Sequence, residues 1–219
     1  MRNAIFAALL LNACANMSPN EPEIRARLEI LLLLRSLSLA STPAVICRNQ
    51  GYCITFRTAA TYAGTGVLGT SGADAKCNAD GNKPANTGTY KALIGDDALN
   101  RRACSSANCG TSGAAEHIDW VLYANTEYRR VNQTTVIFTT NANGIYIFGG
   151  AVTRWDGTGS SYNTGLNGDW TTSGGNTCTS WTVGGGSGMQ GVGNSVGVNM
   201  LANSSIGCAS TVGLACVQQ

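Results

Sequence analysis

Near its end the chain reads VGLACV, residues 212–217, a run that predicts a terminal β-strand carrying Cys216. Far upstream, residues 73–80 predict a short helix that carries Cys77. Ser71 is its expected N-cap, Asp74 the acid at the third helical position, and Gly81 the residue that closes it. A cysteine therefore lies on an early helix and another on the last strand, and we expect both segments to belong to a single domain.

The segments between these two anchors predict mainly strands. Further β segments are expected at residues 53–58, 90–94, 135–139 and 145–148, and residues 117–122 predict a strand or a helical turn. An early helix followed by short strands and glycine turns indicates an α+β domain. We place this domain at residues 47–219, which is long enough for one hydrophobic core.

The first thirteen residues have the features of a lipoprotein signal peptide. Arg2 gives a positive start, residues 5–11 are apolar, and the stretch LNAC ends in Cys14 as a loose lipobox. We therefore predict cleavage before Cys14 and acyl chains on Cys14 that anchor the mature chain in a membrane. The alternative is an ordinary secretory signal with an incidental cysteine.

Residues 14–46 differ in composition from the rest. Asn20 and Glu23 resemble a capping box, and leucines follow to about residue 39, where the run is too short to span a bilayer. We interpret residues 14–46 as a tether with a helical, leucine-rich middle. A helix packed against the domain is the alternative.

The cysteine count agrees with export. Of nine cysteines, eight remain when Cys14 is set aside, and an even set in an exported protein predicts a disulfide framework. Eight cysteines allow about 105 pairings by counting alone. Zinc binding is disfavoured because the chain has one histidine and no Cys-x-x-Cys pair.

Charge and motifs narrow the function to binding. From Cys47 onward ten Lys and Arg residues face nine Asp and Glu residues, so no basic field favours nucleic acid. The chain lacks a nucleophile elbow and a phosphate-binding loop, and Glu116-His117 is expected to be a solvated loop pair. We therefore predict no enzyme activity, no cofactor and no metal site.

Several segments resemble a known family. NTCTSW at residues 176–181, SIGC at 205–208 and LACV at 214–217 resemble the carboxy-terminal part of endostatin, a member of the C-type-lectin-like fold. A closer resemblance is to leptospiral endostatin-like lipoproteins, through GADAKC at 72–77, YKAL at 90–93, NRRAC at 100–104 and TGLNGDWTT at 164–172.

The resemblance implies a fold, a disulfide pattern and partners. It implies an endostatin-like domain with the pairs Cys77–Cys216 and Cys178–Cys208, and local pairs Cys47–Cys53 and Cys104–Cys109 follow for the remaining cysteines. It also implies a lipid-anchored protein of a spirochaete outer membrane, at the cell surface, that binds host extracellular-matrix or plasma proteins such as laminin, fibronectin, plasminogen or complement factor H. A structural envelope lipoprotein and a calcium-independent lectin are the alternatives; the calcium-binding motifs of lectins are missing.

Two arginine pairs are the candidate ligand contacts, Arg101-Arg102 and Arg129-Arg130. Arginine is enriched at interfaces and its planar guanidinium suits carboxylates and sulfates. The alternative interpretation is that these are solvated loop charges. The tryptophans, in contrast, are expected to be core or loop-anchoring residues.

Overall fold

A computed structural model describes residues 47–149 and 153–219. Cys14, the predicted signal peptide and the predicted tether lie outside the described residues. The described part is an α+β domain with mostly strands, few helices and four disulfides. Among its described helices, none combines the length and the apolar character needed to cross a bilayer.

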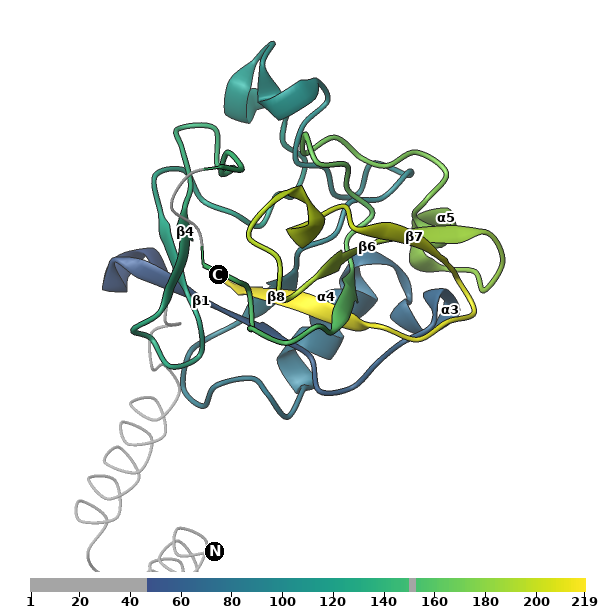
Figure 1. The fold of residues 1–219 in the computed structure, drawn as a ribbon, viewed down its shortest axis with the longest axis horizontal. Coiled ribbons are helices and arrows are strands. Elements are labelled where there is room, and N and C mark those ends of the chain that lie inside the picture. The colour runs from purple at the N-terminus through teal and green to yellow at the C-terminus, as the bar shows by residue number, and fades with distance from the viewer. Residues whose placement is uncertain (1–46, 150–152) are drawn as a thin grey trace, which may run out of the picture. The chain divides into compact units, whose positions relative to one another are not determined.

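The last strand, β8 (Gly213–Gln218), is the centre of the sheet (Figure 1). It pairs antiparallel with β1 (Tyr52–Arg57) and with the short β2 (Tyr90–Ala92), and parallel with β5 (Ser161–Asn163). All six of its residues are buried. Neighbours on both edges satisfy its backbone groups, which explains how an apolar strand at the end of the chain lies in the middle of the domain.

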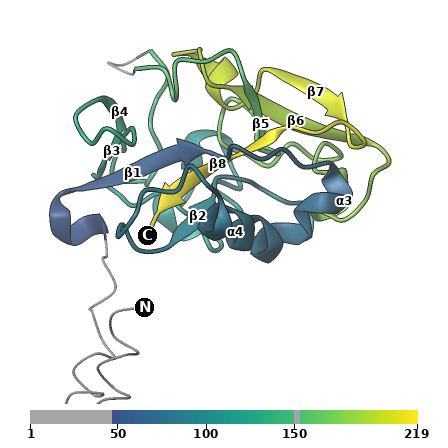
Figure 2. The same ribbon diagram turned by 90° about the horizontal axis from the view of Figure 1, so that it is seen from below.

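The sheet extends from β8 in two directions, in the order β4-β3-β1-β8-β5-β6-β7. On one side β1 pairs in parallel with β3 (Glu127–Arg129), which pairs with β4 (Val136–Thr139). On the other side β5 pairs with β6 (Ser187–Val192), and β6 pairs with β7 (Ser204–Gly207). Figure 2 shows these two wings extending from opposite ends of the central strands.

In the described part of the chain, two α-helices precede β2. They are α3 (Gly64–Val67) and α4 (Gly69–Ala79), and α4 lies alongside β2 and β8 (Figure 2). The predicted helix starts four residues earlier than expected, and Ser71 is not its N-cap. Leu68, in the left-handed conformation, joins α3 to α4. Residue 72 must be glycine, because a Cβ atom at this position would lie 2.4 Å from the Val67 carbonyl oxygen.

Alternation along β8 divides the core into two clusters. Leu214 and Cys216 point to the cluster beneath α4, whereas Ala215 and Val217 point to the larger aromatic cluster on the other face. Trp155 and Trp170 belong to the larger cluster and Trp181 to the smaller, and all three are buried as expected.

The disulfides staple both clusters and are the four pairs that the resemblance implies. Cys77–Cys216 joins α4 to β8, and Cys178–Cys208 joins two loops. Cys47–Cys53 and Cys104–Cys109 close local loops. A bridge across 139 residues of sequence stabilises the fold by about 4–5 kcal/mol in chain-entropy terms.

The segment α5 (Cys178–Trp181) is a left-handed turn. All four of its residues have positive φ, between 50° and 64°. Left-handed backbone costs about 1–2 kcal/mol per non-glycine residue. The Cys178–Cys208 bridge, the Thr177 side chain and the buried Trp181, whose indole N–H donates to the Gly95 carbonyl oxygen at 2.9 Å, hold it in place.

Several smaller expectations were wrong. Residues 117–122 form neither strand nor helix beyond an isolated bridge between Arg102 and Ile118, and residues 145–148 form no strand. Elsewhere, the described loops contain short 3-10 turns, namely η1 (Cys47–Gln50), η2 (Ala107–Cys109), η3 (Gly113–Glu116) and η4 (Val198–Met200). In 145–148 the aromatic side chains of Tyr146 and Phe148 stack around Trp170, so packing replaces the strand pairing.

Candidate binding cleft

The candidate contact Arg101 is a buried structural residue, which corrects the expectation. Its side chain is 1% exposed and donates to both carboxylate oxygens of Asp74, to Asp119 and to the Ala92 carbonyl oxygen, at 2.5–3.1 Å. Asp74 also accepts a hydrogen bond from the Ala92 backbone N–H at 2.8 Å. Arg101 therefore links α4 to β2 and is no longer a candidate for contact with a ligand.

Charge pairing outweighs burial in this network. Burial of the Arg101 guanidinium lowers its pKa. Hydrogen bonds and charge from Asp74 and Asp119 raise the pKa by more than burial lowers it, so the net change is upward. Burial raises the pKa of Asp119, yet hydrogen bonds and charge from Lys91 and Arg101 leave it below its ordinary value. Both groups are therefore held in their charged forms.

Arg102 is half-buried and also serves the fold. Its Nε and Nη2 donate to the Glu116 carbonyl oxygen at 3.0 and 2.9 Å. Its backbone exchanges hydrogen bonds with Ile118. Arg102 thus fixes the loop that carries Glu116 and has fewer donors left for a ligand.

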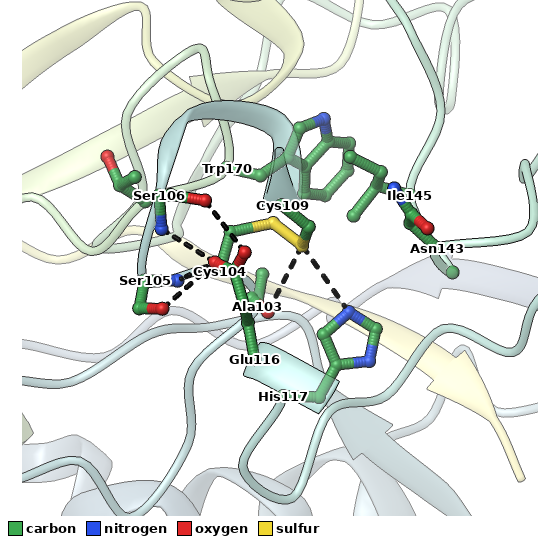
Figure 3. The surroundings of a disulfide bond; sticks show 12 residues. Ala103, Cys104, Ser105, Ser106, Cys109, Glu116, His117, Asn143, Ile145 and Trp170 are labelled. Atoms are coloured by element: carbon green, nitrogen blue, oxygen red, sulfur yellow. Dashed lines mark hydrogen bonds between the residues drawn. A yellow bond between two sulfur atoms is a disulfide. The ribbon is translucent and has the colours of Figure 1, made fainter. Parts of the chain in front are cut away.

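Glu116 is buried, so the expected solvated pair with His117 is wrong. The carboxylate accepts six hydrogen bonds of 2.6–3.1 Å from backbone N–H groups and hydroxyls of the surrounding loop. The donors are Ser105 N, Ser105 Oγ, Ser106 N, Ser106 Oγ, Thr111 N and Ser112 N. Figure 3 shows Ser105 and Ser106 directed at the carboxylate. The Ser112 backbone N–H first, and then the Ser106 hydroxyl, lower the pKa of Glu116 well below its usual range. The carboxylate occupies this nest of donors and holds the Cys104–Cys109 loop closed.

His117 lies on the other side of the same loop. Its Nε2 is 3.7 Å from the Cys109 sulfur, and burial lowers its pKa (Figure 3). Two sulfurs and a ring nitrogen lie within 4.8 Å of one another here. Both sulfurs are joined in the Cys104–Cys109 disulfide, and a metal prefers the free thiolate. The cluster is a brace for the loop.

Arg129 is held on the surface by its neighbours on the sheet. Its guanidinium lies 4.0 Å from the centre of the Tyr52 ring, its Nε donates to Glu127 at 2.5 Å, and its Nη1 donates to the Gln133 carbonyl oxygen at 2.8 Å. Stacking and pairing use most of the planar group. Arg129 therefore supports the end of β3.

Arg130 is the candidate contact that reaches a hollow. It follows the last residue of β3 and lines a cleft of about 290 Å³, together with Arg57, Val131, Trp155 and Asp156. The cleft forms because β1 continues past the point where its parallel partner β3 ends. Trp155 and Asp156 line the hollow that is left beside the end of β1. Val131, which is exposed, also lines the cleft.

The cleft has hydrogen-bond donors in excess. Asp156 already accepts from Arg57 Nε at 3.2 Å, from the Thr158 backbone N–H and from the Thr158 hydroxyl. Arg130 uses Nε and Nη2 on the Arg154 carbonyl oxygen. In the described part of the chain, the terminal N–H groups of Arg57 and Nη1 of Arg130 have no acceptor, and neither has the buried indole N–H of Trp155. The arrangement suits a small group that brings acceptors and negative charge.

Sequence reasoning missed Arg57, Trp155 and Asp156 as parts of this cleft. Arg57 ends a correctly predicted strand, and a charged residue there was a usable signal. Trp155 and Asp156 meet it only because residues far apart in the chain lie on neighbouring segments of the fold.

Taken together, the chain carries a disulfide-stapled α+β domain with an arginine-lined cleft. A family model described as "Protein of unknown function (DUF1554)" matches residues 59–197, and the chain belongs to this family. The matched residues include α4, Arg101 and Arg130, and end before β8. A search of curated proteins finds no match.

Proposed function

We propose that this protein is a lipid-anchored binding module of a bacterial outer membrane that holds host extracellular-matrix or plasma proteins at the cell surface. Laminin, fibronectin, plasminogen and complement factor H are the partners that the resemblance implies. The proposal includes neither a catalytic role nor a cofactor. A lipobox before Cys14 and a disulfide-rich domain support export to an oxidising compartment.

We also infer that the domain is of the endostatin-like, C-type-lectin-like kind and related to the leptospiral lipoproteins. The support is the bridge from α4 to the last strand together with the inner Cys178–Cys208 bridge. The segment 176–181, which carries the resemblance to endostatin, contains the left-handed turn at Cys178–Trp181.

The observation that carries the binding role is the cleft with spare donors on a braced scaffold. Loops held by rigid elements commonly carry recognition. Here the cleft is formed by the end of β1, the turn after β3 and the loop at Trp155. Glu116 and His117, which adjoin in sequence, are committed to bracing a loop, and this favours binding over acid–base chemistry at that place.

Binding to immobilised host proteins tests the proposal. Full-length protein, purified in detergent with its disulfides oxidised, is expected to bind at least one of the four partners saturably. Arg130→Met should weaken this binding, whereas Arg48→Met, which removes an exposed arginine outside the cleft, should leave it unchanged. Absence of saturable binding to all four, by protein with the four correct bridges, would favour a structural envelope lipoprotein.

The anchor and the exposure are tested on cells. Labelled palmitate should be incorporated into the natural protein and lost in Cys14→Ala, which should also release soluble protein. Protease added to intact cells should remove the domain from the surface. Label that persists in Cys14→Ala would contradict the lipid anchor. A domain that resists protease on intact cells and is digested once the cells are opened would contradict the surface location. A glycan array with and without a chelator tests the lectin alternative.

A further inference from the structure

The cleft at Arg57, Arg130 and Trp155 offers charged donors and an apolar wall, and its one carboxylate is already engaged. Asp156 is the acidic residue that lines it, and both of its carboxylate oxygens already accept hydrogen bonds. Two guanidinium groups and one carboxylate leave the cleft with a net positive charge. A ligand that satisfies this cleft must therefore supply oxygen acceptors and a negative charge.

The indole N–H of Trp155, a side chain that lines the cleft, is a further donor without an acceptor among the described residues. Its side chain is 2% exposed, and its nitrogen has no acceptor among the described residues. The other three tryptophans donate to carbonyl oxygens, namely those of Gly144, Tyr146 and Gly95. A buried donor without a partner is costly and uncommon, so an acceptor is missing at this one tryptophan.

Size and surroundings decide between ligand classes. A volume of about 290 Å³ is at the lower limit for small-molecule sites, and it accommodates a single side chain. Phe56, Val131 and Trp155 provide an apolar wall beside the arginines. A sulfated glycan needs an extended basic track, whereas the domain as a whole is nearly neutral.

We propose that the cleft binds the carboxylate of an acidic side chain, a glutamate or aspartate flanked by apolar residues, in an exposed segment of a partner protein. The carboxylate accepts hydrogen bonds from Arg57 and Arg130, and the neighbouring aliphatic groups lie on Val131 and Trp155. The inference rests on the proposed function for the origin of the partner, but the cleft's chemistry is tested without a host protein.

The test is a titration of the full-length, oxidised protein followed by the ¹H–¹⁵N signals of its four tryptophan indoles. The probe is a blocked hexapeptide with one glutamate between two leucines, and the control peptide has glutamine in its place. The glutamate peptide should shift the Trp155 signal saturably and leave the other three in place. Trp155→Phe assigns the signal.

Variants separate recognition from folding. Arg130→Met should weaken the peptide's binding about tenfold or more, as the loss of charge-assisted hydrogen bonds predicts, and Arg130→Lys should restore it only in part because lysine lacks the planar fork. The unchanged signals of the other three indoles report that the variant is folded. Arg48→Met is the matched control and should bind like the natural protein.

The outcomes are distinguishable. Equal shifts with both peptides, or no shift of Trp155 with either, would overturn the carboxylate site while leaving host-protein binding to be judged by its own assay. A Trp155 shift with a heparin oligosaccharide and none with the glutamate peptide would replace the acidic segment by a sulfated glycan. Peptide binding without binding to any host protein would support the cleft and contradict the proposed partners.

Discussion

Arg101-Arg102 and Arg129-Arg130 look alike in the sequence but have different environments. Arg101 is buried against two carboxylates, whereas Arg130 lies at a cleft, and its Nη1 lacks an acceptor in the described region. Their neighbours Arg102 and Arg129 hold loop and strand ends. The availability of a guanidinium for a ligand thus depends on how many of its five donors the protein itself uses.

The largest contrast is expected between Arg101→Met and Arg130→Met. Removing Arg101 leaves Asp74 and Asp119 without their shared cation beside the core, so we expect a loss of about 3 kcal/mol in the free energy of unfolding. Arg130→Met should change it by no more than about 0.5 kcal/mol. Urea unfolding of the oxidised protein measures both. Equal effects of the two variants would remove the distinction drawn between the pairs.

A smaller effect is expected at the loop that Arg102 braces. Glu116→Gln replaces a charged acceptor of six hydrogen bonds by an amide, so the amides of Ser105, Ser106, Thr111 and Ser112 should exchange hydrogen faster. Glu127→Gln, on the surface beside Arg129, is the control and should leave this loop unchanged.

The pH dependence of this effect has a definite sign. Because the folded pKa of Glu116 is lowered, its contribution to stability is present above the unfolded pKa and is lost as the pH falls through the folded pKa. The loop of the natural protein should therefore lose its greater stability over that of Glu116→Gln as the pH falls below about 4.3, the ordinary pKa of glutamate. An advantage that is independent of pH would show that charge is not its source.

Asp119→Asn should be milder than the loss of Arg101. Its side chain is 40% exposed, and Arg101 keeps Asp74, so we expect about 1 kcal/mol or less at neutral pH. The lowered pKa of Asp119 gives the same sign, with stability present above its unfolded pKa and lost as the pH falls. Thermal unfolding at pH 7 and pH 3 measures it. A larger loss than that of Arg101→Met would reverse the proposed hierarchy.

The smallest effect is expected at Arg129. Arg129→Met removes the guanidinium above the Tyr52 ring and should cost about 0.5 kcal/mol. It should leave binding of the glutamate peptide unchanged, since Arg129 does not line the cleft. Weakened peptide binding in this variant would extend the cleft to the whole arginine pair.

Much of the fold was predictable where local patterns and packing agree. The strands around Phe56 and Cys216 lie within one residue of their predicted bounds, because alternation and small apolar residues suit buried strands. The start of α4 was not predictable from Ser71, because the left-handed Leu68 joins two helices there. The turn at Cys178–Trp181 runs against backbone preference and exists because a disulfide and a buried indole hold it.

The sequence by itself determined the α+β class, the even set of cysteines, the near-neutral domain and the arginine pairs as objects of interest. Only the tertiary structure decided which arginine is buried and which one faces a cleft. The physical reason is that partners of a guanidinium, such as Asp74 for Arg101 or the Arg154 carbonyl for Arg130, lie more than twenty residues away. Strand pairing sets contacts over such separations. In the parallel pair β1–β3, β3 ends before β1 does, and Arg130, which follows β3, lines the same cleft as Arg57 and Trp155.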